Sequence, residues 1–395
     1  MKLIRTFHSV GHGAFYTERF YDDSQNVVNV VFDCGCYEGP KSCNSKQYYE
    51  KRINDIVDIV FPLSNEKIKI DALFISHFHT DHINGIPRLL KNCDVKRVIM
   101  PKLTDDAYMQ AIMYSHFVLG ADIKECIDVL EQFKSEIRYD EETNNVIEVD
   151  IDEGDSYPSV VFDNVDMGQL QSSISKPTVL TIFSAKWKYI PFSTKERKQQ
   201  LINALKQGVG ALCPALSKVP IDFKAIAQLL TNQPTLLNQC KTVYKNVFGG
   251  KKYHNSYSMT LFSGTCESSS TCAQQCHQHI KDLPRYCTKN CMYMGDFEAH
   301  PKKSRKNTNA DQFLTFYDKF WKKVGIIQVP HHGSRDNMNI ALYSPPKIAI
   351  ISAGKDDIYN NPHLDVIVEL QKQNCIPIVV TEAPSTVQQY VYEIL

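Results

Sequence analysis

The sequence has little that would direct the chain to a membrane or out of the cell. None of its apolar runs approaches the roughly 20 residues that are needed to cross a bilayer. The N-terminus, residues 1–13, has no apolar stretch long enough for the core of a signal peptide. Apolar residues at 43 % and charged residues at 22 % are ordinary globular proportions. We therefore expect a cytoplasmic protein that does not bind a membrane.

The sequence also lacks net charge, because 44 Lys and Arg residues balance 44 Asp and Glu residues. A global attraction to nucleic acid is not indicated, so an anionic ligand must be met by local charge such as the basic run at residues 301–307. We find no helix-turn-helix, no finger motif and no basic helix, and these absences give no support to recognition of double-stranded DNA. Internal repeats and low-complexity tracts are absent too.

Short apolar strands alternate with helices along the chain, which predicts an α/β protein. Over residues 104–240 the pattern is mainly helical, and we interpret this stretch partly as an insertion into a single domain spanning residues 1–395. The expected strands are at residues 2–10, 27–35, 71–77, 95–101, 146–151, 177–185, 257–264, 291–296, 324–330, 347–354 and 375–383. The expected helices are at residues 45–60, 83–92, 105–119, 124–137, 195–208, 222–232 and 361–373.

The segment LFISHFHTDHINGIPRLL, residues 73–90, crowds His77, His79, Asp81 and His82 directly after a buried strand. Imidazoles at positions i and i+2 project to one side of an extended chain, and the aspartate and third histidine follow where the strand turns into a loop. Four donors then surround a small volume and could hold two metal ions. A single histidine is usually a surface or core residue, but H-x-H-x-D-H between a strand and a helix is a specific metal-binding pattern.

The motif S-H-F-H-T-D-H resembles the metal motif of the metallo-β-lactamase-fold hydrolases. This resemblance implies a four-layer αββα sandwich, with metal ligands at one edge of two packed sheets. Asp33 in FDCG resembles the aspartate that supports the site from an early strand, and Asp296 in MGDFE resembles the aspartate that bridges two metals. His331 and His332 in VPHHGSR resemble the strand end that supplies the last histidine.

The order VGxG, HxHxDH, NSxSxxL, GDxE, PHHGS, SAG and NPH is similar to the soluble metallo-β-lactamase domain of ComEC-type DNA-uptake competence proteins and their free-standing relatives. The similarity covers about residues 1–100 and 250–395. The chain lacks the membrane helices of those proteins, so a transport role does not carry over. Broad members of the fold supply another metal-binding histidine between the first cluster and the bridging aspartate, and His254 is the only candidate for it. His12 stands where the family often has glutamine. His12 either lines the cleft as a substrate contact or fills it.

The resemblance implies two divalent metal ions. His77 and His79 would hold the first ion with one further group, Asp81 and His82 would hold the second with His331 or His332, and Asp296 would bridge the two. The mixed donors fit Zn²⁺ or Mn²⁺ better than Mg²⁺ or Ca²⁺, without choosing between the first two. Metals about 3.5 to 4 Å apart activate a shared water and stabilise an in-line displacement at phosphorus.

Further side chains are candidates for contact with the substrate. We assign His331 to the metal and His332 to catalysis beside Asp81, while leaving open which of the two histidines is the ligand. Ser334 and Arg335 would contact the phosphate, although Arg335 is equally well explained as a surface residue. His363, at the start of the last helix, is a candidate acid or substrate contact. A simpler explanation of this segment is that Asn361 caps the helix.

The chain has thirteen cysteines, of which five fall between residues 266 and 291, a segment that we expect to be a Cys-rich insertion. Two C-x3-C pairs, Cys272 with Cys276 and Cys287 with Cys291, would share the faces of two short helices. In a reducing compartment four sulfurs favour one structural Zn²⁺, and in an oxidising one they favour two disulfides. Free cysteines in a surface insertion are the remaining alternative.

The leading hypothesis is a metal-dependent phosphodiesterase or nuclease that acts on a nucleic acid or nucleotide with a metal-activated water. One alternative is a hydrolase of a lactone, thioester or amide, since the fold excludes none of these. Another is a regulatory or scaffold subunit with a degenerate site, whose insertion binds a protein partner. Activity is favoured because the expected ligands are present. The sequence indicates neither which substrate is cleaved nor the oligomeric state.

Overall fold

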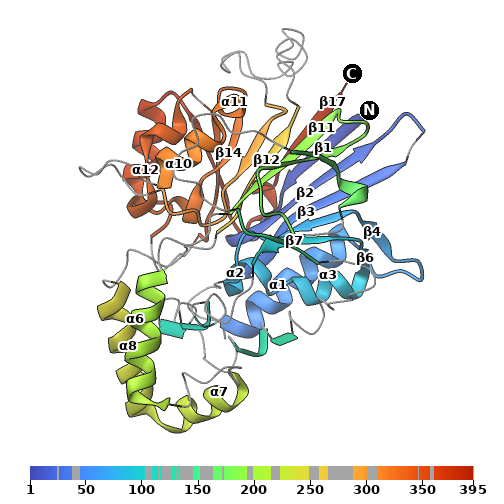
Figure 1. Ribbon diagram of the computed structural model, residues 1–395. Coiled ribbons are helices and arrows are strands. Elements are labelled where there is room, and N and C mark those ends of the chain that lie inside the picture. The colour runs from blue at the N-terminus through green and yellow to red at the C-terminus, as the bar shows by residue number, and fades with distance from the viewer. Residues whose placement is uncertain are drawn as a thin grey trace.

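A computed structural model shows two β-sheets packed face to face, with helices on both outer faces (Figure 1). This mixed α/β arrangement confirms the expected αββα sandwich. The structure describes residues 1–24, 26–37, 45–102, 146–151, 163–170, 173–193, 199–214, 223–248, 258–265, 288–299, 309–345, 347–355 and 360–394, with short pieces between 109 and 132. None of the helices in these ranges is both long enough and apolar enough to cross a membrane.

The first sheet joins the two ends of the chain, because the last strand pairs with the first. Its strand order is β17-β1-β2-β3-β5-β7-β8, antiparallel from β17 to β3 and parallel from β3 to β8. The strands are β1 (Lys2–Phe7), β2 (His12–Tyr21), β3 (Val27–Tyr37), β5 (Ala72–Phe74), β7 (Val98–Pro101), β8 (Val146–Val149) and β17 (Gln388–Glu393). Neither β2 nor β17 was predicted from the sequence.

The second sheet has the order β16-β15-β14-β13-β12-β11-β10-β9, and its strands run parallel from β13 to β16. The strands are β9 (Asp163–Asp166), β10 (Thr178–Ile182), β11 (Trp187–Phe192), β12 (Thr260–Gly264), β13 (Cys291–Tyr293), β14 (Ile326–Gln328), β15 (Ile348–Ser352) and β16 (Ile376–Val380). A small separate sheet pairs β4 (Ile68–Ile70) with β6 (Cys93–Val95). Strands β4, β9 and β11 were not predicted.

The side chains of the first sheet alternate between two apolar layers. Val30 and Phe32 of β3 lie in the cluster that also contains the strands of the second sheet, whereas Val31 lies in the cluster that contains α1 (Ser45–Val60) and α3 (Ile86–Asn92). Successive residues of a strand point to opposite faces of the sheet, so β3 separates the inner core from the helical layer. The sequence prediction of a helix over residues 45–60 is confirmed by α1.

Helices α10 (Asn309–Phe316), α11 (Asp318–Trp321) and α12 (Leu364–Lys372) cover the other side of the sandwich (Figure 1). Helices α6 (Gln199–Leu212), α7 (Phe223–Asn232) and α8 (Pro234–Phe248) form a group of their own beside α1 (Figure 1). Their buried residues, such as Leu205 and Tyr244, share the apolar cluster of α1. The helical character expected of this region is therefore present, and its assignment as an insertion stays a prediction.

A buried ion pair links the two sheets away from the helices. Nε of Arg5 on β1 donates to Oε1 of Glu18 on β2 at 2.7 Å, and both side chains are almost completely buried. The Glu18 carboxylate also accepts from Tyr189 of β11 at 2.7 Å and from Tyr293 of β13 at 2.8 Å. The carboxylate of one sheet is thus satisfied by hydroxyl groups of the other, which fixes how the sheets face each other.

Candidate metal centre

The H-x-H-x-D-H motif lies between β5 and helix α3, at one end of the first sheet. His77 and His79 follow β5 in the loop, and Asp81 and His82 belong to the short helix α2 (Thr80–Ile83). All four side chains are buried. The structure thus brings together the four donors that the motif predicts.

Glycine at position 35 allows β3 to contact the backbone of α2. A Cβ atom at Gly35 would lie 2.6 Å from the carbonyl oxygen of Asp81, which is closer than real Cβ contacts. The backbones of the two elements therefore pack directly against each other. This contact holds the Asp81 and His82 backbone over the end of the sheet.

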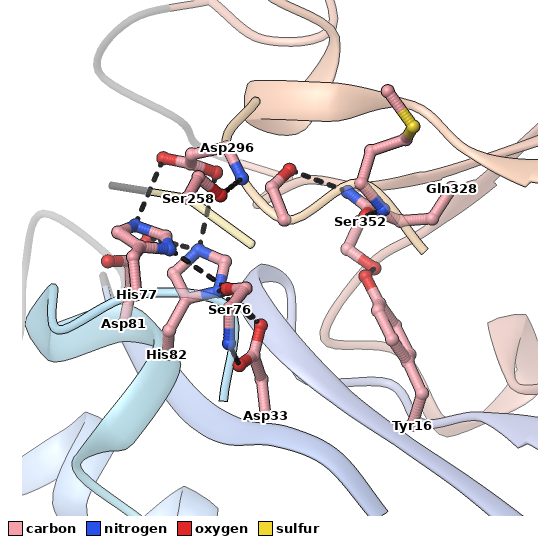
Figure 2. Close-up of polar contacts among 12 residues, drawn as sticks. Tyr16, Asp33, Ser76, His77, Asp81, His82, Ser258, Asp296, Gln328 and Ser352 are labelled. Carbon is pink, nitrogen blue, oxygen red and sulfur yellow. Dashed lines mark hydrogen bonds and ion pairs between the residues drawn. The ribbon is translucent and has the colours of Figure 1, made fainter. Parts of the chain in front are cut away.

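Asp33 orients His82 from beneath the site, as the sequence predicted of a supporting aspartate. Its Oδ1 accepts from the backbone N–H of Ser76 at 2.6 Å, and its Oδ2 accepts from the Ser76 hydroxyl at 2.6 Å and from Nδ1 of His82 at 2.8 Å (Figure 2). A histidine that donates through Nδ1 presents Nε2 as a metal donor. Burial raises the pKa of Asp33, against the opposing effects of His82 and Ser76.

The second half of the site comes from the other sheet. Asp296 follows β13, and the preceding Gly295 has a left-handed backbone with φ of 52°. The backbone N–H of Asp296 donates to Ser258 Oγ at 3.0 Å, and the side chain of Gln328 accepts from Met294 N at 2.7 Å (Figure 2). Neighbouring strands therefore fix the turn that carries the aspartate.

The two carboxylate oxygens of Asp296 face different histidines. Oδ1 lies 3.3 Å from Nε2 of His82 and 3.5 Å from Nε2 of His332. Oδ2 lies 3.6 Å from Nε2 of His77 and 3.7 Å from Nδ1 of His331. A carboxylate in this position stands between two sets of donors, and its role as a bridging ligand stays a prediction.

His332 lies deeper in the site than His331. Its Nδ1 donates to the backbone carbonyl of Ser352 at 2.9 Å, which points Nε2 towards Asp81 Oδ2 at 3.1 Å. The side chain of His331 is 20 % exposed, whereas that of His332 is 2 % exposed. Among the described residues His332, and not His331, belongs to the groups spaced to hold a metal ion, and which of the two binds metal stays a prediction. The left-handed backbone at both residues turns their side chains apart, which the sequence did not reveal.

His12, expected to line the cleft, also lies among the donors. It begins β2, its Nε2 is 3.5 Å from Asp81 Oδ2, and its ring centroid is 3.9 Å from that of His332. Within the described part of the chain, the groups of side chains spaced to hold a metal ion are His12 with Asp81 and His332, His77 with His79 and Asp296, and His82 with Asp296 and His332.

The donor set fits divalent metal ions. Among the described residues, Nε2 of His77, Oδ1 of Asp81 and Nε2 of His82 are buried without a hydrogen-bond partner. Donors about 2.1 Å from a tetrahedral ion lie about 3.4 Å from each other. The separations of 3.1 Å between His332 and Asp81, and of 3.3 Å and 3.6 Å from Asp296 to His82 and His77, match this spacing.

Burial and charge favour the ligand forms of His77, His79, Asp81 and Asp296, whereas the carboxylates around His82 raise its pKa against the effect of burial, so His82 has to lose a proton when a metal binds. Burial lowers the pKa of His77, and it lowers the pKa of His79 to about 3, so both imidazoles are neutral near pH 7. Burial alone would raise the pKa of Asp81 and Asp296. The surrounding histidines, chiefly His82 for Asp81, nevertheless hold both pKa values below the ordinary range. Neutral imidazole and ionised carboxylate are the forms that bind metals.

The outer candidates lie along one turn beside His332. The backbone N–H of Arg335 donates to Nδ1 of His363 at 3.4 Å, and the backbone N–H of His363 donates to the carbonyl of Gly333 at 3.2 Å. His363 itself is the N-cap residue of α12, where we had considered capping by Asn361. Arg335 is exposed and Ser334 is half-buried, so their contact with a substrate stays a prediction.

Several predicted features lie outside the described residues, namely His254, Cys272, Cys276, Cys287 and the basic run at 301–307. Cys291 is described and occupies the buried start of β13, within the core between the sheets. The sequence suggested two placements for Cys291, on a helix face with Cys287 or at the start of a strand over residues 291–296, and the structure shows the strand. The structural zinc stays a prediction, since its other three cysteines lie outside the described residues.

Residues 29–157 match the family model of the metallo-beta-lactamase superfamily. The chain carries a metallo-beta-lactamase superfamily domain. The match contains Asp33 and the whole H-x-H-x-D-H motif. The domain and its His and Asp clusters support a metal-dependent hydrolase that binds divalent metal.

Two curated relatives of the domain are Ribonuclease J of Mycoplasma genitalium and of Mycoplasma pneumoniae, each 35 % identical over 60 residues and 15 % of this chain. The match spans 10 % of the length of each relative. Unliganded yeast PDE1 is 10 % identical over 99 % of this chain and 100 % of its own, with a TM-score of 0.41. A metallo-beta-lactamase motif mutant from Cronobacter sakazakii is 10 % identical over 80 % of this chain and 74 % of its own, with a TM-score of 0.27.

Proposed function

We propose that the protein is a dinuclear-metal phosphodiesterase or nuclease that acts on a nucleic acid or nucleotide. The observation that carries the proposal is the position of Asp296, whose two oxygens face His82 and His332 on one side and His77 on the other. One carboxylate between two donor groups suits a pair of divalent cations. The short resemblance to Ribonuclease J favours a phosphodiester substrate.

Each donor group would hold one cation. The first group is His77, His79 and Asp296, and the second contains Asp81, His82, His332 and the same Asp296. When bound, such a pair supplies a nucleophilic water at neutral pH and stabilises charge on the attacking and leaving oxygens. Zn²⁺ and Mn²⁺ both suit this donor set.

Other side chains of the chain would position the substrate. His331 stands at the partly exposed side of Asp296, where its imidazole can donate a hydrogen bond to a phosphate oxygen. Arg335 supplies an exposed positive charge on the same turn, and His363 is attached to that turn by two hydrogen bonds. We assign these three residues to phosphate binding, with His363 also placed to protonate a leaving group.

The test is cleavage of labelled single-stranded RNA, single-stranded DNA and bis(p-nitrophenyl) phosphate with Mn²⁺ or Zn²⁺. The double variant Asp81→Ala, His82→Ala should lose cleavage and bound metal. His8→Gln is a matched control, since His8 is a buried histidine that pairs with Thr17 outside the donor groups. Wild-type protein that binds metal but cleaves no phosphodiester would reject the proposal and direct the search to lactones, thioesters and amides.

A further inference from the structure

The two donor groups on either side of Asp296 are unequal. On the side of Oδ2, the group spaced to hold an ion contains His77 and His79, and His331 lies 3.7 Å from this oxygen but outside that group. On the side of Oδ1, it contains His82, His332 and Asp81. The third group of spaced donors, His12 with Asp81 and His332, shares two members with this richer side. The described part of the site therefore gathers more donors around one position than around the other.

The position of His12 is built into the fold. Its side chain is buried, and the next residue, Gly13, has φ of 140°. A Cβ atom at Gly13 would lie 2.6 Å from the carbonyl oxygen of Asp81 and 2.5 Å from that of Gly35. Only glycine allows this approach, which brings the start of β2 against α2. The loop before His12 is also held from α1, because the guanidinium of Arg52 donates to the backbone carbonyl of Ser9.

His12 and His332 converge on the same oxygen. Nε2 of His332 lies 3.1 Å and Nε2 of His12 lies 3.5 Å from Oδ2 of Asp81. The two rings lie side by side, with centroids 3.9 Å apart and planes inclined by 33°. Both separations from the carboxylate are close to the roughly 3.4 Å between neighbouring donors of one ion, and with Asp296 the ion would have five protein donors, a number that zinc sites also reach. A substrate contact would not require this convergence.

We infer that His12 is a protein ligand of the cation held by Asp81, His82 and His332, and that the two cations are consequently bound with unequal strength. The inference rests on the metal pair of the proposed function, but not on the bond that is cleaved. The cation beside His12 has a protein-rich shell, typical of a tightly held ion. The cation beside His77 and His79 keeps positions for water or substrate, as catalytic sites do.

Metal affinity tests this inference without an activity assay. Metal-free protein is titrated with Zn²⁺ in competition with a chromophoric chelator, and with Co²⁺ while the visible absorption is recorded. Wild-type protein should bind one equivalent more tightly than the second. His12→Gln should weaken the tighter equivalent by about 10-fold or more and leave the weaker one unchanged, since even residues that only orient a ligand contribute that much. His8→Gln should behave as wild type.

A second variant identifies direct ligation. His12→Cys places a thiolate at the same position and should give a cysteinate-to-cobalt charge-transfer band at the first equivalent of Co²⁺. Thermal unfolding of the metal-free variants checks that they fold. Wild-type affinity and an unchanged Co²⁺ spectrum in His12→Gln would overturn the inference, as would a His12→Cys protein without the band. Absence of phosphodiester cleavage by the loaded wild type would instead reject only the proposed function.

Discussion

The carboxylate of Asp33 lies 2.8 Å from Nδ1 of His82, at the bottom of the site and on the side of the ring opposite Nε2. The same carboxylate accepts from the backbone and hydroxyl of Ser76, so it is held rigidly by its own partners. Both side chains of the pair are fully buried. The imidazole therefore has one orientation, with Nε2 directed at Asp296.

Asp33→Asn should weaken metal binding without removing any ligand. The amide presents only one acceptor oxygen to the three donors that surround Asp33, so the orientation of His82 is lost. Removal of such a supporting group typically lowers metal affinity by about 10- to 100-fold. Competition with a chelator measures this directly. Unchanged affinity would show that His82 is oriented without the carboxylate.

Gly35→Ala should destabilise the protein and disrupt the site. The new Cβ would lie 2.6 Å from the backbone of Asp81, which cannot move without displacing α2. Overpacking of this kind costs about 1–3 kcal/mol in the free energy of unfolding. Urea unfolding and metal content are the measurements. Gly168→Ala is the control, because its Cβ would meet only the end of the Asp166 side chain at 2.9 Å.

Glu18→Gln should be strongly destabilising although it lies outside the metal centre. It leaves the Arg5 charge buried between the sheets without its counter-ion, and the loss of one partner of a buried pair costs about 3–5 kcal/mol. The double variant Arg5→Met, Glu18→Gln should lose less stability than the sum of the losses in Arg5→Met and Glu18→Gln, because neither charge remains. Strict additivity in denaturant unfolding would contradict the coupling.

Lys347 should give the protein a pH-dependent stability. Its ammonium is buried, 3.1 Å from the carbonyl of Pro345 and 4.6 Å from the centroid of the Trp321 ring, and burial lowers its pKa to about 7. The unfolded chain has the ordinary value of 10.5. Below pH 7 the lysine is protonated in both states, and the cost of burying its charge is fully present. As pH rises above 7, the folded state loses this proton first, so its stability increases.

Between pH 7 and 10, Lys347 should increase the free energy of unfolding by about 1.4 kcal/mol per pH unit, which is the slope for a difference of one bound proton between the two states. Lys347→Met should remove this part of the slope. Chemical unfolding of both proteins at several pH values, with the difference plotted against pH, isolates the contribution of the lysine. A difference that does not vary with pH would contradict the shifted pKa.

The donors that could be predicted from the sequence belong to contiguous motifs at strand ends. His77, His79, Asp81 and His82 lie within one short segment, and Asp296 follows an apolar strand. Their role as metal donors can be predicted because residues close together in one loop are also close together in space. The choice between His331 and His332 depends on a left-handed turn, and the place of His12 depends on the approach of two backbones. Neither leaves a periodic signal in the sequence.

Strands β2 and β17 were missed because β2 is buried on both faces and β17 lies at the edge of the sheet. Strand β2 has apolar Phe15 and Tyr16 buried on opposite faces, and it buries polar Glu18 as well, so its hydrophobic alternation is hidden. Strand β17 lies at the sheet edge and contains two glutamines. Charged residues are seldom buried without partners. The hydrogen-bond partners of Glu18 include Tyr293, which lies 275 positions away along the chain. Local propensity does not reveal such contacts.

The donors of the metal centre come from two sheets whose strands are far apart along the chain. A growing chain that has not yet reached Asp296 carries the H-x-H-x-D-H loop but lacks the aspartate and histidine of the opposite sheet. Binding of metal by both groups of donors would therefore follow synthesis of most of the chain and closure of the sandwich.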